Sequence, residues 1–121
     1  MSQSENFYSL HDPDSGIPRQ LAPGITTQIF AGEQAMFSVV SFAPGSRGSI
    51  HHHPEEQWGV MLEGTGTRIQ SGEEFAVSQG DFWCTPPNVE HGVVAGPEGA
   101  KVLDVFAPPR EAYRKAGAGF S

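Results

Sequence analysis

The segment Gly45–Gly64 has the sequence GSRGSIHHHPEEQWGVMLEG and places two histidines and a glutamine between two glycines. His51 and His53 are two residues apart. Side chains on an extended strand alternate between its faces, so we expect both imidazoles on one side, roughly 7 Å apart along the chain. Gln57 follows four residues later and can extend the same group of side chains. His52 is expected to point away from it.

A second segment, GDFWCTPPNVEH at residues 80–91, ends in a further histidine, His91. Together with His51, His53 and Gln57 it would complete a set of four uncharged ligands. Imidazole nitrogen suits divalent transition metals, and four protein ligands leave positions open on an ion that takes five or six. The sequence therefore predicts a small metal site with room for a substrate. It does not select among Ni, Zn, Mn, Co and Fe, because imidazole and amide ligands accept all of them.

Length and composition limit the alternatives. A chain of 121 residues supports one domain. It shows neither a signal peptide nor an apolar stretch that could span a membrane, so we expect a cytoplasmic protein. The single cysteine, Cys84, has no internal disulfide partner and is expected to be a buried small hydrophobe. A formal charge of −7 argues against nucleic-acid binding, which requires Lys and Arg patches.

Short strands with frequent turns are predicted for most of the chain, since it contains 15 glycines and 10 prolines. We expect nine or ten strands, with breaks at Glu63-Gly64 and between Val94 and Lys101, and a strand at 58–62 (WGVML) buried on both faces. This pattern indicates an all-β sandwich or barrel. The predicted boundaries are an N-terminal arm or edge segment at 1–23, a β-barrel at 24–110 and a C-terminal helix or tail at 111–121.

The two histidine-containing segments resemble the two motifs of the cupin superfamily. The resemblance covers roughly residues 24–110 and implies a single-domain double-stranded β-helix, or jelly-roll barrel, with a metal inside and a short C-terminal helix after it. Two positions depart from the family pattern. Gln57 stands where the first motif usually has a carboxylate, and Asn88 replaces the inner glycine of the second motif. Asparagine can adopt the left-handed conformation, so the turn is expected to survive.

A third segment, Asp104-Val-Phe106-Ala-Pro-Pro-Arg110, sharpens this resemblance. With the histidines and Gln57 it is similar to the KdgF family, cupins of pectin and alginate breakdown that linearise 4,5-unsaturated monouronates. The resemblance implies that His51, His53, Gln57 and His91 hold the metal. It also implies that Asp104, Phe106 and Arg110 are the residues on the substrate side. An acid, an aromatic ring and a cation would then serve as proton carrier, platform and carboxylate clamp.

Replacing a glutamate ligand by Gln57 leaves the charge of the ion uncompensated. This favours Lewis-acid chemistry on a small anionic substrate and disfavours a ferric state. Two alternatives stay open: an Fe(II) dioxygenase acting on a small acid or thiol, and a non-catalytic cupin that binds a small ligand. Trp58 and Trp83 are expected in the core or in a homodimer interface. The pair Glu55-Glu56 is expected in a solvated loop.

Overall fold

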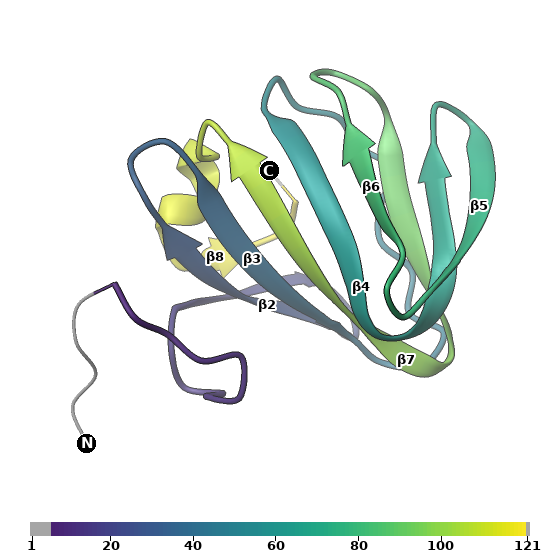
Figure 1. The fold of residues 1–121 in the computed structure, drawn as a ribbon, viewed down its shortest axis with the longest axis horizontal. Coiled ribbons are helices and arrows are strands. Elements are labelled where there is room, and N and C mark those ends of the chain that lie inside the picture. The colour runs from purple at the N-terminus through teal and green to yellow at the C-terminus, as the bar shows by residue number, and fades with distance from the viewer. Residues whose placement is uncertain (1–5, 121) are drawn as a thin grey trace.

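The computed structural model describes residues 6–120, and nearly all of its regular structure is β (Figure 1). The strands are β1 (Ile17–Ala22), β2 (Ile25–Ala31), β3 (Met36–Phe42), β4 (Glu56–Gln70), β5 (Glu73–Ser78), β6 (Phe82–Thr85), β7 (His91–Ala107) and β8 (Gly117–Ala118). A 3-10 helix, η1 (Glu111–Arg114), lies between β7 and β8. This confirms the predicted all-β fold. Within residues 6–120, no helix has the length and apolar character needed to cross a membrane.

Two long strands, β4 and β7, run through the whole fold and pair with each other from Glu56↔Ala107 to Gln70↔His91. The predicted breaks in both strands are therefore wrong. The pairing shifts register between Met61 and Gly66, at the site of the expected break, and continues beyond it. Gly64 has a φ of 83° there, and a Cβ atom would lie 2.2 Å from the carbonyl oxygen of Gly99. The glycine thus bends the strand pair without ending it.

The bend in β4 and β7 folds one sheet into two halves that face each other (Figure 1). The order along the sheet is β5-β4-β7-β3-β2-β1-β8, with β6 added on β4. The first half contains β1, β2, β3, β6 and β8 with one end of each long strand. The second half contains β5 with their other ends. This is the two-layered jelly roll that the sequence predicted.

Cross-strand register decides which side chains meet inside. One inward-facing row is Met36, Phe106, Gln57 and Thr85, and the next is Ser38, Asp104, Gly59 and Trp83. The interior is therefore apolar on the β3 side and polar on the β6 side. The apolar cluster comprises Leu21, Ile25, Ile29, Met36, Val40, Phe106 and Tyr113.

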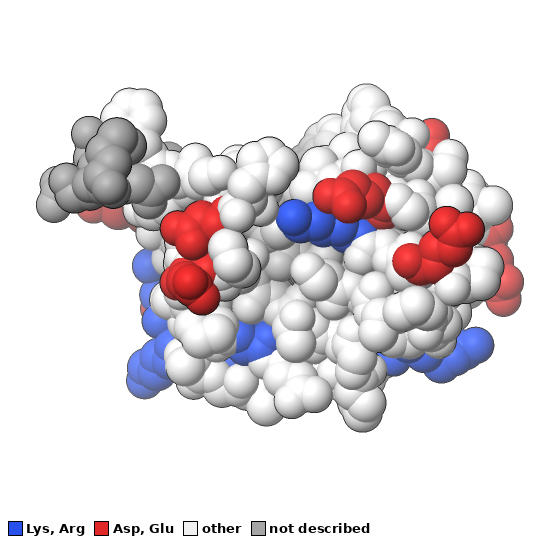
Figure 2. Space-filling model, turned by 90° about the horizontal axis from the view of Figure 1, so that it is seen from below, with Lys and Arg blue, Asp and Glu red and all other residues white. Residues whose placement is uncertain are grey.

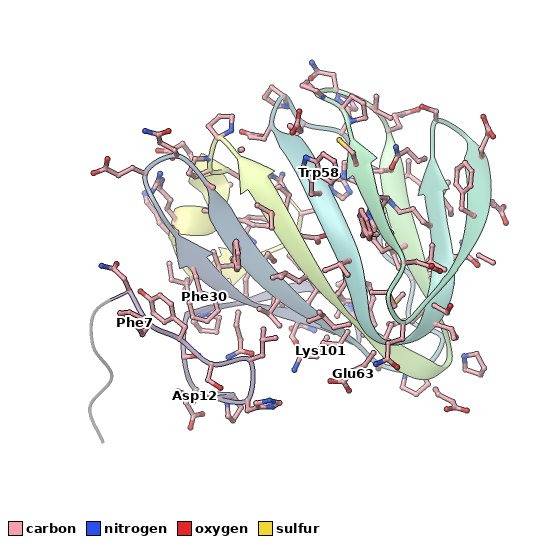
Figure 3. The ribbon with its side chains drawn as sticks, viewed as in Figure 1. Phe7, Asp12, Phe30, Trp58, Glu63 and Lys101 are labelled. Carbon is pink, nitrogen blue, oxygen red and sulfur yellow. The ribbon has the colours of Figure 1, made fainter. Side chains whose placement is uncertain are left out.

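The segment at 58–62 alternates between the two faces of β4. Gly59 and Met61 are buried, whereas Trp58 is 46% exposed on the outer face (Figure 3). The expectation of burial on both faces is wrong, because only one face of this part of the sheet is covered. Trp58 is consequently not a core residue. Trp83, on the neighbouring β6, points inward and is half-buried.

The loops that carry the two predicted motifs are joined to each other by backbone hydrogen bonds. His51 forms an isolated antiparallel bridge with His91 instead of the short strand that was expected at 51–53. The Asn88 amide donates to the carbonyl of His53 over 2.8 Å. Asn88 has a φ of 66°, which confirms the prediction that it takes the left-handed conformation. These bonds bring the two motifs together at one end of the barrel.

The C-terminal segment returns to the first half of the sheet. The expected helix is limited to the four residues of η1, and β8 then pairs in parallel with β1. Tyr113 of η1 is fully buried and closes the apolar cluster.

The face seen in Figure 2 carries acidic and basic side chains interspersed with uncharged surface. The proposed division of the chain at residues 23 and 110 stays a prediction, although Ile17–Ala22 of the arm is strand β1.

Candidate metal centre

Three histidines come together where the two motif loops meet. His51 and His53 extend from the loop before β4, and His91 begins β7. One nitrogen from each ring lies within 4.8 Å of the corresponding nitrogens of the other two. His53 and His91 are buried and His51 is half-buried, whereas His52 is exposed, as predicted. The spacing of His51 and His53 therefore places both rings on one side.

The backbone fixes which nitrogen of each ring is available. Nδ1 of His51 lies 2.9 Å from the Ser49 carbonyl, Nδ1 of His53 lies 3.1 Å from the Glu55 carbonyl, and Nδ1 of His91 lies 2.8 Å from the Val89 carbonyl. A carbonyl only accepts hydrogen bonds, so each Nδ1 carries the proton and each Nε2 keeps a lone pair. Carbonyl partners of this kind orient histidine ligands in metal sites.

Burial keeps these imidazoles neutral. It lowers the pKa of His51 to about 4 and the pKa of His91 to about 3, and Arg68 contributes to both shifts. Burial, followed by the charge of Arg110, also lowers the pKa of His53. Neutral imidazole is the form that binds a metal. The cluster is therefore in its ligand form at neutral pH.

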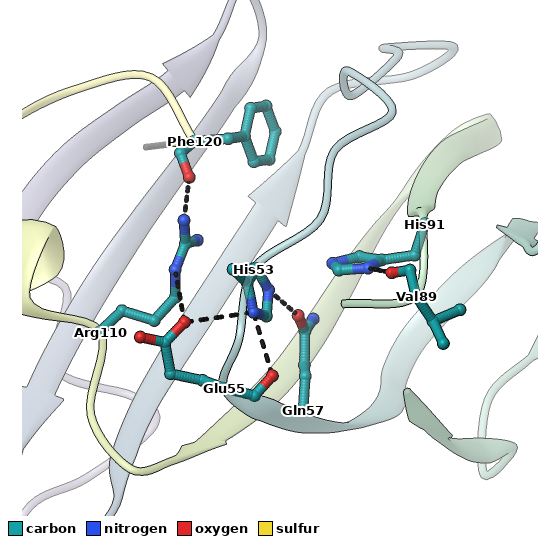
Figure 4. Close-up of polar contacts among 7 residues, drawn as sticks. All are labelled: His53, Glu55, Gln57, Val89, His91, Arg110 and Phe120. Atoms are coloured by element: carbon teal, nitrogen blue, oxygen red, sulfur yellow. Dashed lines mark hydrogen bonds and ion pairs between the residues drawn. The ribbon is translucent and has the colours of Figure 1, made fainter. Parts of the chain in front are cut away.

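Gln57 joins the histidines through its side-chain oxygen, which lies 3.0 Å from Nε2 of His53 (Figure 4). Its amide group hydrogen-bonds to Asp104, which orients the oxygen toward the histidine. Both facing atoms carry lone pairs, and Nε2 of His91 is buried without a hydrogen-bond partner among residues 6–120. A buried polar atom without a partner is costly. A cation among these four side chains would satisfy all of them, so the donor set fits a metal.

Asp104 faces the cluster from β7. Burial raises the pKa of its carboxyl group to about 6, against the opposing effects of Arg68, Gln57 and Arg110. Its Oδ1 atom is inaccessible and has no partner among the described residues. A carboxyl group with this pKa can both accept and donate a proton near neutral pH. Asp104 is thus an interior residue and does not lie on the outer surface of the sheet.

Arg110 is also buried beside the site, so it is not a surface residue. Its Nη2 donates to the Phe120 carbonyl, and its Nε lies 4.0 Å from the Glu55 carboxylate (Figure 4). The guanidinium lies 4.3 Å from the ring centroid of Tyr113. Its Nη1 has no partner within residues 6–120. The neighbouring Phe106 belongs to the apolar cluster. Its ring centroid also lies 5.6 Å from the ring centroid of His53.

Comparison with known proteins agrees with this geometry. The family model "Cupin domain" matches residues 38–106, more than half of the chain. The chain is a cupin. It is 31% identical over 93 residues to the pectin degradation protein KdgF of Dickeya dadantii, covering 75% of this chain and 84% of that protein. The solved structure of KdgF from Halomonas sp. superposes with a TM-score of 0.80 at 29% identity, over 90% and 98% of the two chains.

Other cupins of different activity also match. The dimethylsulfoniopropionate lyase DddW of Ruegeria pomeroyi is 31% identical over 77 residues, which cover 64% of this chain and 51% of the lyase. Cupins similar to this one therefore include enzymes, and the three close histidines of this chain favour a metal site. The family alone does not fix the reaction.

One expectation near the site is wrong. Glu55 was expected in a solvated loop, yet its side chain is only 17% exposed and its carboxylate lies 3.4 Å from Nδ1 of His53. It also faces Arg110. Its neighbour Glu56 is exposed, as expected. The sequence Glu55-Glu56 does not indicate that Glu55 faces Arg110, because Arg110 lies 55 residues farther along the chain.

Sequence reasoning missed Arg68, a buried cation in the polar half of the interior. Gln57 faces inward on β4, and strict alternation from it would place Arg68 on the outer face. The register shift between Met61 and Gly66 reverses this alternation, so Arg68 is 4% exposed and faces the cavity. Alternation along a strand cannot reveal such a bulge. Tyr113 was also missed, although it is the one aromatic side chain in the segment REAYRK.

Proposed function

We propose that this cupin is a metal-dependent enzyme that opens the ring of a small unsaturated uronic acid. The observation that carries the proposal is the buried Oδ1 atom of Asp104, which has no partner among residues 6–120 and lies next to four neutral side chains with lone pairs. The similarity to KdgF supports the substrate class, because it extends over 84% of that protein. A substrate with a carboxylate suits a site bordered by the buried arginines Arg68 and Arg110.

His51, His53, Gln57 and His91 would hold a divalent transition metal, which supplies Lewis-acid polarisation of substrate oxygens when bound. Asp104 would accept the proton of the anomeric hydroxyl as the ring C–O bond breaks and the aldehyde forms. The same carboxyl group would return the proton to the enol carbon, giving the ketone. The proton lost is the proton gained, so the step is an isomerisation without an oxidant or reductant. Arg110 would contribute positive charge and its unpartnered Nη1 toward the substrate carboxylate.

The test is loss of the ultraviolet absorbance of a 4,5-unsaturated galacturonate in the presence of metal-loaded protein. The variant Asp104→Asn should lower kcat by roughly 10²–10⁴-fold, the range expected for a general acid–base group. Its metal content should equal that of the wild type. Full metal content without any loss of absorbance would reject the proposal. Cleavage of dimethylsulfoniopropionate in a parallel assay would assign lyase activity instead.

We also propose that the protein is a homodimer that pairs through its outer sheet face. Trp58, Val105 and Phe37 lie in one row across β4, β7 and β3, with Cys84 of β6 at its end. Trp58 and Phe37 are each 46% exposed, and Phe82 in the next row is 72% exposed. Contiguous apolar surface of this kind commonly marks an interface. Trp83 faces inward and takes no part in it.

Light scattering tests this assembly. The wild type should give twice the mass of 13.0 kDa, and Trp58→Ser should shift it toward the monomer. We also propose that the protein resides in the cytoplasm. Its single cysteine, Cys84, cannot form a disulfide within the chain, which agrees with a reducing compartment.

A further inference from the structure

Arg68 is held rigidly on the inner face of β4 by its neighbours. Its Nη2 donates to the Thr85 hydroxyl over 2.7 Å, and that hydroxyl donates to the side-chain oxygen of Gln70 over 2.7 Å. The Gln70 amide in turn donates to the Cys84 carbonyl. The guanidinium lies 5.4 Å from the ring centroid of Trp83. This network fixes the position of the cation and leaves its Nη1 atom without a hydrogen bond to any residue of the described chain.

The position of Arg68 connects two spaces. It lines the small cavity of about 30 Å³ that is also bordered by His51, His91 and Asp104. It also lines a groove of about 520 Å³ between β5 and β6, whose wall includes Trp83. A monosaccharide cannot fit in the small cavity, whereas sites for ligands of this kind usually enclose about 300–1,000 Å³. The groove beside Arg68 is therefore the neighbouring space with the volume that a sugar acid needs.

Trp83 belongs to the same surface. It lies over Gly59, where a Cβ atom would be only 2.5 Å from Nε1 of the indole. Gly59 pairs with Asp104 on the other side, so the indole and the carboxyl group flank one glycine. Nε1 of Trp83 is buried without a partner among residues 6–120. The groove wall thus presents the indole ring of Trp83 beside the Arg68 guanidinium, while the indole N–H is turned toward Gly59.

Arg68 and Arg110, the buried arginines that border the histidine cavity, differ in what already neutralises them. Arg110 donates to the Phe120 carbonyl and faces the Glu55 carboxylate. Arg68 has no carboxylate of residues 6–120 within ion-pair distance, and the charge of Asp104 acts on it only from farther away. A buried charge without a partner is costly, and an anionic ligand would compensate it. The metal ligands are all neutral and add no negative charge of their own. Arg68 is therefore the cation with the greater need of an anion.

We propose that Arg68, beside the indole ring of Trp83, binds the carboxylate of the substrate in the groove between β5 and β6, and that Arg110 has the smaller share in this contact. This assignment rests on the proposed function only for the substrate class, a monosaccharide acid. Arg68 would be a positioning residue: it holds the carboxylate while the sugar ring reaches the histidines and Asp104.

The experiment measures binding instead of turnover. The probes are D-galacturonate and D-galactose, which share a ring and differ in the carboxylate. The protein is metal-loaded Trp58→Phe, in which Trp83 is the single tryptophan. Fluorescence then reports the groove directly. Galacturonate should bind more tightly than galactose, and Arg68→Gln should lower this ratio of affinities about 10-fold or more, as expected for loss of a charge-assisted contact. Arg68→Lys should recover part of the ratio.

Arg47→Gln is the matched control, because it removes the same charge from an exposed position and should leave the ratio unchanged. Arg110→Gln should lower the ratio less than Arg68→Gln. If Arg68→Gln does not fold, Thr85→Val removes only the hydroxyl that holds Arg68 and should lower the ratio about threefold. An unchanged ratio, an equal loss of affinity for both sugars, or a larger effect of Arg110→Gln each overturns the assignment. Since neither probe is unsaturated, these results are independent of whether the proposed ring opening occurs.

Discussion

The two sides of the barrel interior differ in how completely their side chains are satisfied. On the β3 side, Ile25, Ile29 and Met36 belong to a cluster that excludes water, and the two buried hydroxyls nearby bond to each other over 2.6 Å. On the β6 side and around the histidines are the buried side-chain polar atoms without partners among residues 6–120: Trp83 Nε1, His91 Nε2, Asp104 Oδ1 and Arg110 Nη1.

This difference separates stability from function. Buried apolar side chains stabilise the fold, whereas buried polar groups without partners lower stability and are retained where a ligand will meet them. The apolar side should therefore determine the free energy of unfolding, and the polar side should determine binding. Each of the following predictions tests that separation.

The largest effect is expected on metal binding. His91→Ala removes one of the four proposed ligands and should weaken the affinity for a divalent transition metal by more than about 100-fold, since even partners of the ligands account for about 10–100-fold. The metal-free variant should unfold within about 1 kcal/mol of the wild type, because removal of the buried, unpartnered Nε2 atom offsets the lost hydrogen bond and packing of this buried ring. Calorimetric titration with Zn²⁺ and urea unfolding measure the two quantities. A loss in the free energy of unfolding of about 2 kcal/mol or more, as expected for truncation of a core residue, would contradict the separation of stability from binding.

Ile29→Ala is the corresponding change on the apolar side. Ile29 is 1% exposed, and its truncation should lower the free energy of unfolding by about 2–5 kcal/mol through lost burial and a residual cavity. Its affinity for Zn²⁺ should match that of the wild type. Urea unfolding of the metal-free protein and the same titration check both statements. Weakened metal binding in this variant would show that the two sides are coupled.

The pH dependence of stability should report Asp104. Burial raises the pKa of this carboxyl group to about 6 from an ordinary value of 3.8, so the folded state holds the proton more tightly than the unfolded state. Its stabilising contribution is complete below pH 3.8 and is lost as the pH rises through 6, a change of about 3 kcal/mol. Urea unfolding of metal-free protein between these limits should show a decline relative to Asp104→Asn, which cannot titrate. Parallel curves for the two proteins would contradict it.

The smallest effect concerns the turn that joins the two motifs. Asn88 has a φ of 66°, a conformation that costs an alanine about 1 kcal/mol or more. Asn88→Ala should therefore lower the free energy of unfolding by about 1 kcal/mol, while Asn88→Gly should leave it nearly unchanged. Thermal unfolding of both variants is the measurement. Equal losses would mean that the Asn88 side chain, and not its backbone conformation, stabilises the turn.

Local patterns predicted the features of this cupin that depend on a few neighbouring residues. The two-residue spacing of His51 and His53 placed their rings together, and the left-handed Asn88 followed from turn chemistry. The predicted strand breaks were wrong because glycines such as Gly64 and Gly99 can bend a pair of strands without ending either strand. Sequence alone does not distinguish these outcomes, since the pairing partner decides between them.

The sequence by itself determined the all-β class, the cupin motifs and which three histidines lie close together, because each depends on residue type and short spacing. Only the tertiary structure decided that Arg68 faces inward, that Glu55 turns toward Arg110, and that the Phe120 carbonyl meets the same guanidinium. The physical reason is that alternation along a strand holds only until a register shift reverses it, and that contacts between distant segments depend on how the sheet closes.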